Sequence, residues 1–236
     1  MDKSVTVVIT SCGRFDLLQK SITSFQEVNT YPIKEYIVID NSAGPYVLTL
    51  DILTAIMPQN THIILNETNI GQVASIDKAY SEVKTPYIFH TEEDWAFHNP
   101  NEIIDTGYEL MKQKEATFIQ DSMFLLELDP TIMNVNIRKR NDGTKGSEHP
   151  VKNFQTKNNI SWYEYESGYC GVYHGFSWNP GLRRLVDYKI LGNFKQFGCE
   201  EGMNAAYYNL GYKAVSLEKS YCTHIGEDTL TELRNQ

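Results

Sequence analysis

The chain has 236 residues, of which 41% are hydrophobic and 12% aromatic, so it can bury a core large enough for one α/β domain over residues 1–236. Its 21 basic and 30 acidic residues give a formal net charge of −9, which disfavours nucleic acid and anionic membrane surfaces as the main partners. A phosphorylated small molecule stays open as a ligand, because a metal ion or a helix N-terminus can bind phosphate locally.

The four cysteines are far apart and form no Cys-x-x-Cys pair, so neither a structural zinc site nor a dense disulfide framework is expected. The N-terminal residues lack the pattern of a signal peptide, and no run approaches the ~18 apolar residues of a membrane-spanning helix. We therefore expect a soluble, cytoplasmic protein with free thiols and no integral membrane segment.

The first part of the chain alternates strand and helix patterns. Apolar, β-branched runs predict buried strands at residues 5–10, 36–40, 62–65 and 86–90. Helices are expected after each strand: the first carries Phe15, Leu18, Ile22 and Phe25 at helical spacing, and the others cover residues 48–57, 72–83 and 99–114. This alternation predicts right-handed crossovers and a mostly parallel central sheet flanked by helices.

The middle of the chain differs in charge. Residues 134–159 carry a formal charge of +4, from Arg138, Lys139, Arg140, Lys145, Lys152 and Lys157 against Asp142 and Glu148. A long polar stretch is typical of a functional loop or of disorder, and the aromatic residues 162–165 beside it indicate an ordered hairpin. We expect residues 134–167 to be a polar loop or insert, whose cationic part is a candidate lid.

Regular structure is expected to resume in the last third of the chain. The pattern predicts a helix that starts at residues 179–181, a second helix at about 200–210, and a strand at 213–217. A short polar segment, residues 222–226, follows this strand.

Four polar clusters follow the predicted strands of the first part: residues 10–14, 40–42, 69–71 and 92–94. Ligands of parallel sheets bind outside the carboxyl ends of the strands. We therefore expect these four clusters to converge on one binding site.

Three adjacent carboxylates, Glu92, Glu93 and Asp94, follow the fourth predicted strand. Their mutual repulsion would be relieved by Mg²⁺ or Mn²⁺, which prefer oxygen ligands and often bridge to substrate phosphates. An isolated acidic turn in solvent is the simpler interpretation, and the position after a buried strand favours a functional site. His224 would complete an oxygen-rich site, although most single histidines are surface or core residues.

Other polar residues allow both a structural and a functional interpretation. Glu200 and Glu201 begin a predicted helix, where acidic residues contribute ~0.3–1 kcal/mol, and one of them could instead be a general base. The trio Asp40, Asn41 and Ser42 could form an Asx turn or bind a nucleoside. Arg14 could be solvated or contact a phosphate, and residues 69–71 could be a plain helix entry.

Several catalytic motifs are absent from the sequence. It contains no Gly-x-Ser-x-Gly, no Gly-x-x-x-x-Gly-Lys-Ser/Thr, and no Gly-x-Gly-x-x-Gly after the first predicted strand. Hydrolase, P-loop and dinucleotide-binding functions are therefore disfavoured.

The ordered set of motifs resembles the GT-A (Rossmann-like) glycosyltransferases, most closely their inverting, family 2-like group. Residues 5–14 and 36–42 are similar to the family's first two strands with their nucleotide-binding residues. Residues 69–71 match its Asn-x-Gly turn, and residues 92–94 stand in the place of its Asp-x-Asp metal motif. Residues 199–213 resemble its Gly-Glu-Asp element with the Gly-Tyr segment that follows.

The resemblance implies a division of the chain and a role for each matching residue. Residues 1–126 would form the nucleotide-sugar-binding half and residues 168–236 the acceptor-side half, whereas residues 134–167 match no part of the family. The residues implied to bind the donor are Thr10, Arg14, Asp40, Asn41, Ser42, Asn69, Gly71, Glu92 and Glu93. Those implied to bind Mn²⁺ or Mg²⁺ are Asp94 and His224, and the residue in the position of the catalytic base is Glu201, beside Glu200.

Two of these positions depart from the family pattern. Glu92 and Glu201 replace the commoner Asp, which lengthens their reach by one methylene and leaves open which of Glu200 and Glu201 is the base.

The implied reaction is displacement at the anomeric carbon of a nucleoside-diphosphate sugar, with a UDP-sugar favoured, by the hydroxyl of a glycan or another acceptor, with inversion. Two alternatives stay open. One is an inactive nucleotide-sugar or glycan-binding module, and the other is a sugar-1-phosphate nucleotidyltransferase, whose glycine-rich loop is reduced here to Gly13 and Arg14. No sequence pattern indicates an oligomeric state.

Overall fold

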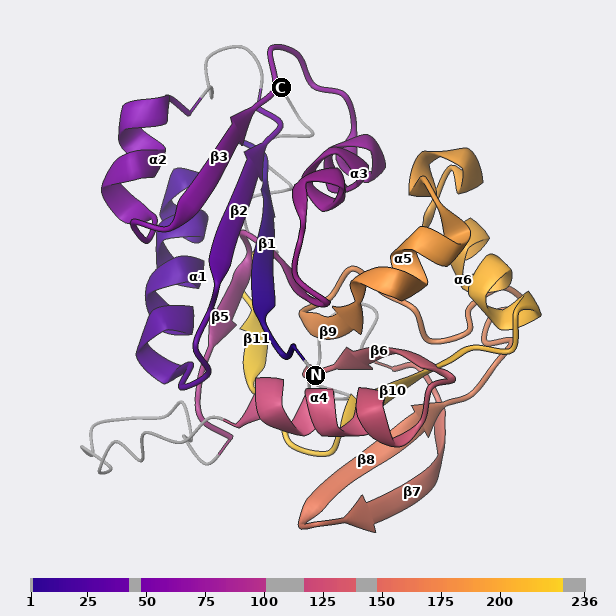
Figure 1. Cartoon of the computed structure of the whole chain (residues 1–236). Coiled ribbons are helices and arrows are strands. Elements are labelled where there is room, and N and C mark those ends of the chain that lie inside the picture. Colours follow the sequence, from indigo (N-terminus) through magenta and orange to yellow (C-terminus); the bar gives the residue numbers. More distant parts are fainter. Residues whose placement is uncertain (1, 43–47, 101–116, 139–147, 227–236) are drawn as a thin grey trace.

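A nine-stranded sheet lies at the centre of the computed structural model, which describes residues 2–42, 48–100, 117–138 and 148–226 (Figure 1). Its strands are β1 (Val5–Ser11), β2 (Glu35–Asp40), β3 (Thr61–Leu65), β4 (Tyr87–Glu92), β6 (Ile132–Asn136), β7 (Val151–Lys157), β8 (Ile160–Tyr165), β9 (Gly181–Arg184) and β10 (Lys213–Leu217). The spatial order is β3-β2-β1-β4-β9-β6-β10-β8-β7. A separate two-stranded ribbon pairs β5 (Trp95–Phe97) with β11 (Cys222–His224).

The first half of the sheet is parallel and the second half is mixed. Strand β1 pairs in parallel with β2 and β4, and β2 pairs in parallel with β3. Strand β9 then runs antiparallel to both β4 and β6, while β6 and β10 are again parallel to each other. The expected α/β architecture with helices on both faces is confirmed. Its purely parallel part lies within residues 1–126, for which the resemblance predicts nucleotide-sugar binding.

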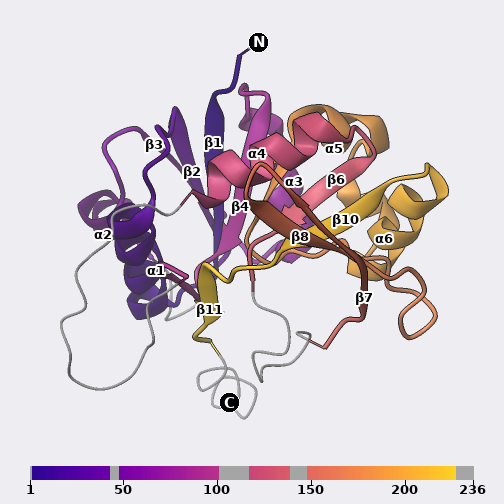
Figure 2. The same ribbon diagram turned by 90° about the horizontal axis from the view of Figure 1, so that it is seen from below.

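Helices cover both faces of this sheet. They are α1 (Phe15–Val28), α2 (Leu50–Ile56), α3 (Gln72–Glu82), α4 (Phe118–Leu128), α5 (Leu185–Leu191) and α6 (Glu200–Asn209), with a 3₁₀ turn η2 at Phe194–Phe197. The core on one face joins α1, α2 and α4 to the sheet, and the core on the other joins α3, α5, η2 and α6 to it. The helices also differ in their position along the sheet: α1 and α2 lie at one end of the molecule and α5 and α6 at the other (Figures 1 and 2).

The predicted helix start at residues 179–181 is wrong. Residues 181–184 form strand β9, and α5 begins only at Leu185. Gly181 packs so closely on β6 that an added Cβ would lie 2.5 Å from the carbonyl oxygen of Val135. Only a glycine allows β9 to pack this closely on β6. In the sequence, the proline before this glycine resembles the start of a helix.

The polar segment in the middle contains more regular structure than a loop. Its first residues belong to β6, where Asn134 and Asn136 are buried and the Asn134 amide donates to the Asn136 side chain over 2.9 Å. The predicted hairpin is present as β7 and β8, and β8 joins the sheet by pairing antiparallel with β10. Residues 139–147, the centre of the candidate lid, and residues 101–114 of a predicted helix lie outside the described residues.

No helix among the described residues is both long enough and apolar enough to cross a membrane. All four cysteines are free thiols, as expected, and of these only Cys222 is buried.

Substitution of Phe25, on α1, tests the core that joins α1, α2 and α4 to the sheet. The Phe25 ring is 1% exposed and contacts Phe89 and Phe97 with ring centroids 5.4 and 5.1 Å away. Phe25→Ala should lower the free energy of unfolding by about 3–5 kcal/mol, because a large cavity replaces the ring. Urea denaturation measures this, with Phe154→Ala as the control: that ring is 53% exposed, and its loss should cost less than about 1.5 kcal/mol. Equal losses in the two variants would contradict the described core.

Candidate active site

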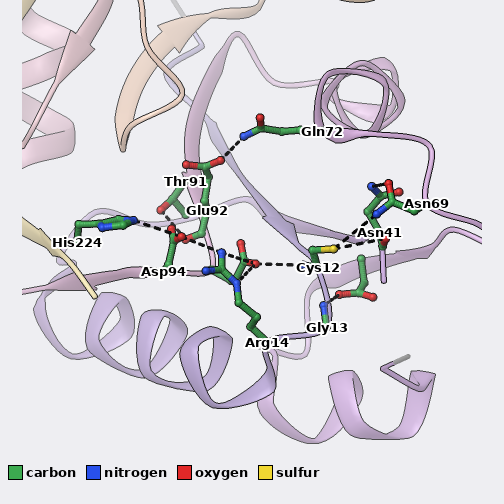
Figure 3. A network of polar contacts seen from close by, with 12 residues as sticks. Cys12, Gly13, Arg14, Asn41, Asn69, Gln72, Thr91, Glu92, Asp94 and His224 are labelled. Carbon is green, nitrogen blue, oxygen red and sulfur yellow. Dashed lines mark hydrogen bonds and ion pairs between the residues drawn. The ribbon is translucent and has the colours of Figure 1, made fainter. Parts of the chain in front are cut away.

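The polar side chains that follow the parallel strands converge at the carboxyl edge of the sheet (Figure 3). In the register between β1 and β4, Thr10 lies opposite Glu92, so the two chains leave the sheet at the same level. The Thr10 carbonyl accepts a hydrogen bond from the Glu93 amide over 3.1 Å, and the Cys12 amide donates to the Glu93 carboxylate over 3.1 Å. The clusters after β1 and β4 therefore meet at this edge, as predicted, and a shared binding site stays a prediction.

Arg14 connects the turn after β1 with the acidic residues after β4. Its Nε lies 2.8 Å from Oε1 of Glu93, and its Nη2 lies 2.7 Å from the same oxygen and 2.8 Å from Oδ2 of Asp94. The three side chains are largely buried, with exposed fractions of 15%, 5% and 8% for Arg14, Glu93 and Asp94. One guanidinium group therefore makes charge-assisted contacts with two buried acidic side chains.

The carboxylate of Asp40, at the end of β2, accepts hydrogen bonds through both of its oxygens. One carboxylate oxygen accepts the Gly13 amide over 3.1 Å, and the other accepts both the amide and the hydroxyl of Ser42. Asp40 and Ser42 are buried. These bonds fix the turn after β1 against the end of β2, and the Asx-turn interpretation of this trio holds.

Asn41 likewise holds the end of β2 against the turn that follows β3, through hydrogen bonds of its side chain. Its side-chain oxygen accepts from the Ile70 amide and from the Asn66 side chain, and its amide nitrogen donates to Asn69 over 2.7 Å. Asn69 in turn accepts the amide of Gly71 over 2.9 Å. Gly71 has a φ of 84°, a conformation that favours glycine, and α3 begins directly after it.

The carboxylates after β4 have strongly perturbed acidities. Burial raises the pKa of Glu92 well above its usual value, and the charges of Asp94 and Glu93 add to the effect. The Glu92 carboxylate also accepts a hydrogen bond from Gln72, at the start of α3. Burial raises the pKa of Glu93 to about 7, although the Arg14 charge opposes it. Burial raises the pKa of Asp94 too, but His224 and Arg14 outweigh it and the net pKa is lowered.

His224 reaches this cluster from the far end of the chain. The ribbon of β5 and β11 places it directly opposite Trp95, and its ring centroid lies 4.9 Å from the indole. Its Nε2 is 3.3 Å from Oδ2 of Asp94. The indole also carries the Arg138 guanidinium, 5.1 Å from its centroid. The structure therefore brings His224 and Asp94 together, as the sequence analysis expects.

The described residues show no group of three or more His, Cys, Asp or Glu side chains arranged to hold a metal ion. Asp94 and His224 alone fit a divalent cation whose other ligands come from substrate or water. Their facing atoms are 3.3 Å apart, and neighbouring ligands of an octahedral ion with bonds of ~2.1 Å lie ~3.0 Å apart. The other Asp94 oxygen, Oδ1, is buried and has no hydrogen-bond partner among the described residues.

The two acidic residues that begin α6 have different environments. Glu200 is partly buried and accepts the Trp178 amide over 3.0 Å; burial raises its pKa to about 7, and the neighbouring Glu201 charge adds to this. Glu201 is exposed, and hydrogen bonds from the helix start lower its pKa. The charge of Glu200 also contributes to the raised pKa of Glu92.

Three residues of the site do not belong to the predicted set. Asn66 and Gln72 hold Asn41 and Glu92, and the Cys12 thiol donates to the Asn41 carbonyl over 3.6 Å. The sequence does contain a signal for Asn66, because this residue directly follows the predicted strand at residues 62–65. Asp40 similarly stands at the end of the predicted strand at residues 36–40. Cys12 lies within the first strand-end cluster, but its thiol gives no sign of its partner.

The fold is that of the GT-A glycosyltransferases. The sequence profile of glycosyl transferase family 2 matches residues 6–177, which is most of the chain. The chain therefore belongs to glycosyl transferase family 2. A comparison with curated protein sequences finds no significant match.

Solved structures share the fold at low sequence identity. The mannosyltransferase PcManGT from Pyrobaculum calidifontis, in complex with GDP-Man and Mn²⁺, has a TM-score of 0.64 and 14% identity over 95% of this chain. GalNAc-T7 with UDP, GalNAc and Mn²⁺ gives 0.63 and 13% over 94%, and S. aureus TarS 1-349 with UDP-GlcNAc gives 0.59 and 12% over 95%. The matches cover 57%, 43% and 61% of those chains, so this chain spans about half of their length.

The raised pKa of Glu200 predicts a pH-dependent stability. An ordinary Glu has a pKa of 4.5, so between about pH 4.5 and 7 the unfolded chain ionises Glu200 while the folded protein keeps it protonated. Glu200 therefore stabilises the fold fully below this range and loses that contribution as the pH rises through about 7. Glu200→Gln, which is neutral at every pH, should become more stable relative to wild type as the pH increases.

Urea denaturation across this pH range measures the difference, and Glu201→Gln is the matched control. The pKa of Glu201 is lowered, so its contribution has the opposite sign: it is present above pH 4.5 and is lost on acidification. If both variants changed with pH in the same direction, the described burial of Glu200 would be wrong.

Proposed function

We propose that the protein is a metal-dependent, inverting glycosyltransferase that transfers a sugar from a nucleoside-diphosphate sugar to an acceptor hydroxyl, in the first place that of a glycan. The observation that carries this proposal is the joint position of Arg14, Asp94 and His224 at the carboxyl edge of the parallel strands. This edge is where the ligands of such sheets bind. Family membership supplies the class of reaction, and the strand-end residues supply the chemistry.

The donor would lie across the ends of β1, β2 and β4. Asp40 and Asn41 hold the surrounding turns in place and present the nucleoside with a preformed edge. The neighbours in the structure comparison were solved with GDP-Man in one case and with UDP or UDP-GlcNAc in two. We favour UDP on that balance and on the resemblance.

Asp94 and His224 would hold Mn²⁺ or Mg²⁺, which when bound neutralises charge on the leaving diphosphate. An imidazole next to a carboxylate favours Mn²⁺ over Ca²⁺. Two of the neighbouring structures contain Mn²⁺ with a nucleotide or nucleotide-sugar, which is consistent with this assignment. Arg14 carries an Nη1 group that is buried and has no hydrogen-bond partner among the described residues, and a phosphate oxygen would satisfy it.

Glu201 is the better candidate for the base that deprotonates the acceptor hydroxyl. It is exposed and ionised at neutral pH, whereas the Glu200 carboxylate already accepts the Trp178 amide and has a pKa of about 7. We assign Glu200 a positioning role at the start of α6. Attack from the face opposite the leaving diphosphate gives inversion.

The first test is a screen of nucleotide-sugars with Mn²⁺, with Mg²⁺ and with EDTA, read by thermal shift and by release of nucleoside diphosphate. We expect a UDP-sugar to raise the melting temperature only with the metal present, because a ligand that binds the folded state stabilises it. EDTA should abolish both the shift and the release. Stabilisation without any release across donors and acceptors would favour an inactive binding module, and transfer of a nucleotidyl group would favour the nucleotidyltransferase.

The assignment of the base predicts a contrast between two neighbouring variants. Glu201→Gln should keep donor-induced thermal stabilisation and lower transfer by about 10²–10⁴-fold, the usual contribution of general base catalysis. Glu200→Gln should keep most of the transfer rate, because glutamine still accepts the Trp178 amide. Steady-state rates and donor titrations on both variants separate the two roles. A larger loss of transfer in Glu200→Gln would reverse the assignment.

A further inference from the structure

Arg14 and the proposed metal ion depend on the same carboxylate oxygen. Oδ2 of Asp94 lies 2.8 Å from Nη2 of Arg14 and 3.3 Å from Nε2 of His224 (Figure 3). A divalent cation held between Asp94 and His224 would bind this oxygen too. Two positive groups would then meet at one atom in a region that is mostly buried.

The electrostatic cost of that arrangement is large. Like charges within a few ångströms repel strongly when little water separates them, and the side chains of Arg14 and Asp94 are only 15% and 8% exposed. Arg14 is the cation that the structure shows hydrogen-bonded to two of the three acidic side chains of residues 92–94. Metal binding therefore favours a loosened contact between Arg14 and Asp94.

Arg14 has an alternative partner once a donor is present. Its Nη1 is buried and unpartnered among the described residues, and so is Oδ1 of Asp94. A diphosphate would take the guanidinium, and the cation would take the carboxylate. Both buried groups would be satisfied in the loaded site, and neither is satisfied in the structure described above.

We propose that Arg14 is an internal counter-ion that competes with the divalent cation for Asp94 and is handed over to the donor diphosphate when the metal binds. Arg14 is thus a positioning residue: it keeps the acidic cluster compact before the donor arrives and sets the affinity for the metal. This inference rests on the proposed function for the identity of the ligands, but its test uses metal ions alone.

The test compares Mn²⁺ binding to the whole chain by isothermal titration calorimetry, without nucleotide, in wild type, Arg14→Gln, Arg14→Lys and Lys3→Gln. Arg14→Gln should bind Mn²⁺ at least about tenfold more tightly, because a charge-assisted hydrogen bond no longer competes. Arg14→Lys keeps the charge without the fork and should lie between the two. Lys3→Gln removes the same charge from an exposed pair with Glu127, before β1, and should match wild type.

A second measurement uses the wild-type protein, so it does not depend on how the variants fold. The Nη2–H signals of Arg14 in an NMR spectrum should shift and exchange faster with water on saturation with Mg²⁺, because Nη2 donates to Asp94 and this bond is weakened. Equal or weaker Mn²⁺ binding by a folded Arg14→Gln, or an unchanged Arg14 signal with Mg²⁺ bound, would overturn the inference and leave the metal-dependent function in place. If neither wild type nor Arg14→Gln bound Mn²⁺, the metal assignment would fail together with the inference, and nucleotide-sugar turnover would decide the rest.

Discussion

The contact of Arg14 with Glu93 and Asp94 is the interaction on which the rest of the site depends. Two consecutive carboxylates are buried after β4, and buried charges are costly unless they are paired. Arg14 comes from the turn after β1, some 80 residues earlier, and the parallel register of β1 and β4 brings the two turns to the same level. Without the guanidinium, the two turns would have to separate or the carboxylates would have to bind protons.

The polar residues at the other strand ends also hold turns of the protein together, at the edge of the sheet where a ligand would bind. Asp40 and Asn41 accept hydrogen bonds from backbone amides of the turns that follow β1 and β3. A site whose acceptors already hold its own backbone is preorganised, and little ordering entropy remains to be lost on binding. Ligand groups then meet the outer faces of these turns. Nη1 of Arg14 and Oδ1 of Asp94 have no hydrogen-bond partner among the described residues, so both atoms can still form a hydrogen bond or bind a cation.

The sequence predicts the first half of the fold well because its signals are local. Strands β1 to β4 are apolar runs and α1 has a one-sided pattern, so their type follows from nearby residues. Strands β6 and β9 escape prediction for the opposite reason. Asn134 and Asn136 are polar yet buried: the Asn134 side-chain amide donates to the Asn136 side-chain oxygen, and the Asn136 side-chain amide donates to the Gly175 carbonyl. Gly181 is explained only by a carbonyl of a strand far away in sequence. In the site, residue types predicted the chemistry, but the pairing of Arg14 with the acidic cluster appears only in three dimensions.

The start of α6 shows how one helix can separate two chemically identical side chains. Consecutive helical residues point about 100° apart, so when Glu200 turns toward the Trp178 amide, Glu201 must face another direction. Burial then raises one pKa while hydrogen bonds at the helix start lower the other, and the two carboxylates differ in protonation at the same pH. Glu201 is exposed and ionised, whereas Glu200, whose charge acts on Glu92, is partly buried and incompletely ionised at neutral pH. The division therefore limits the like-charge repulsion within the acidic cluster of residues 92–94.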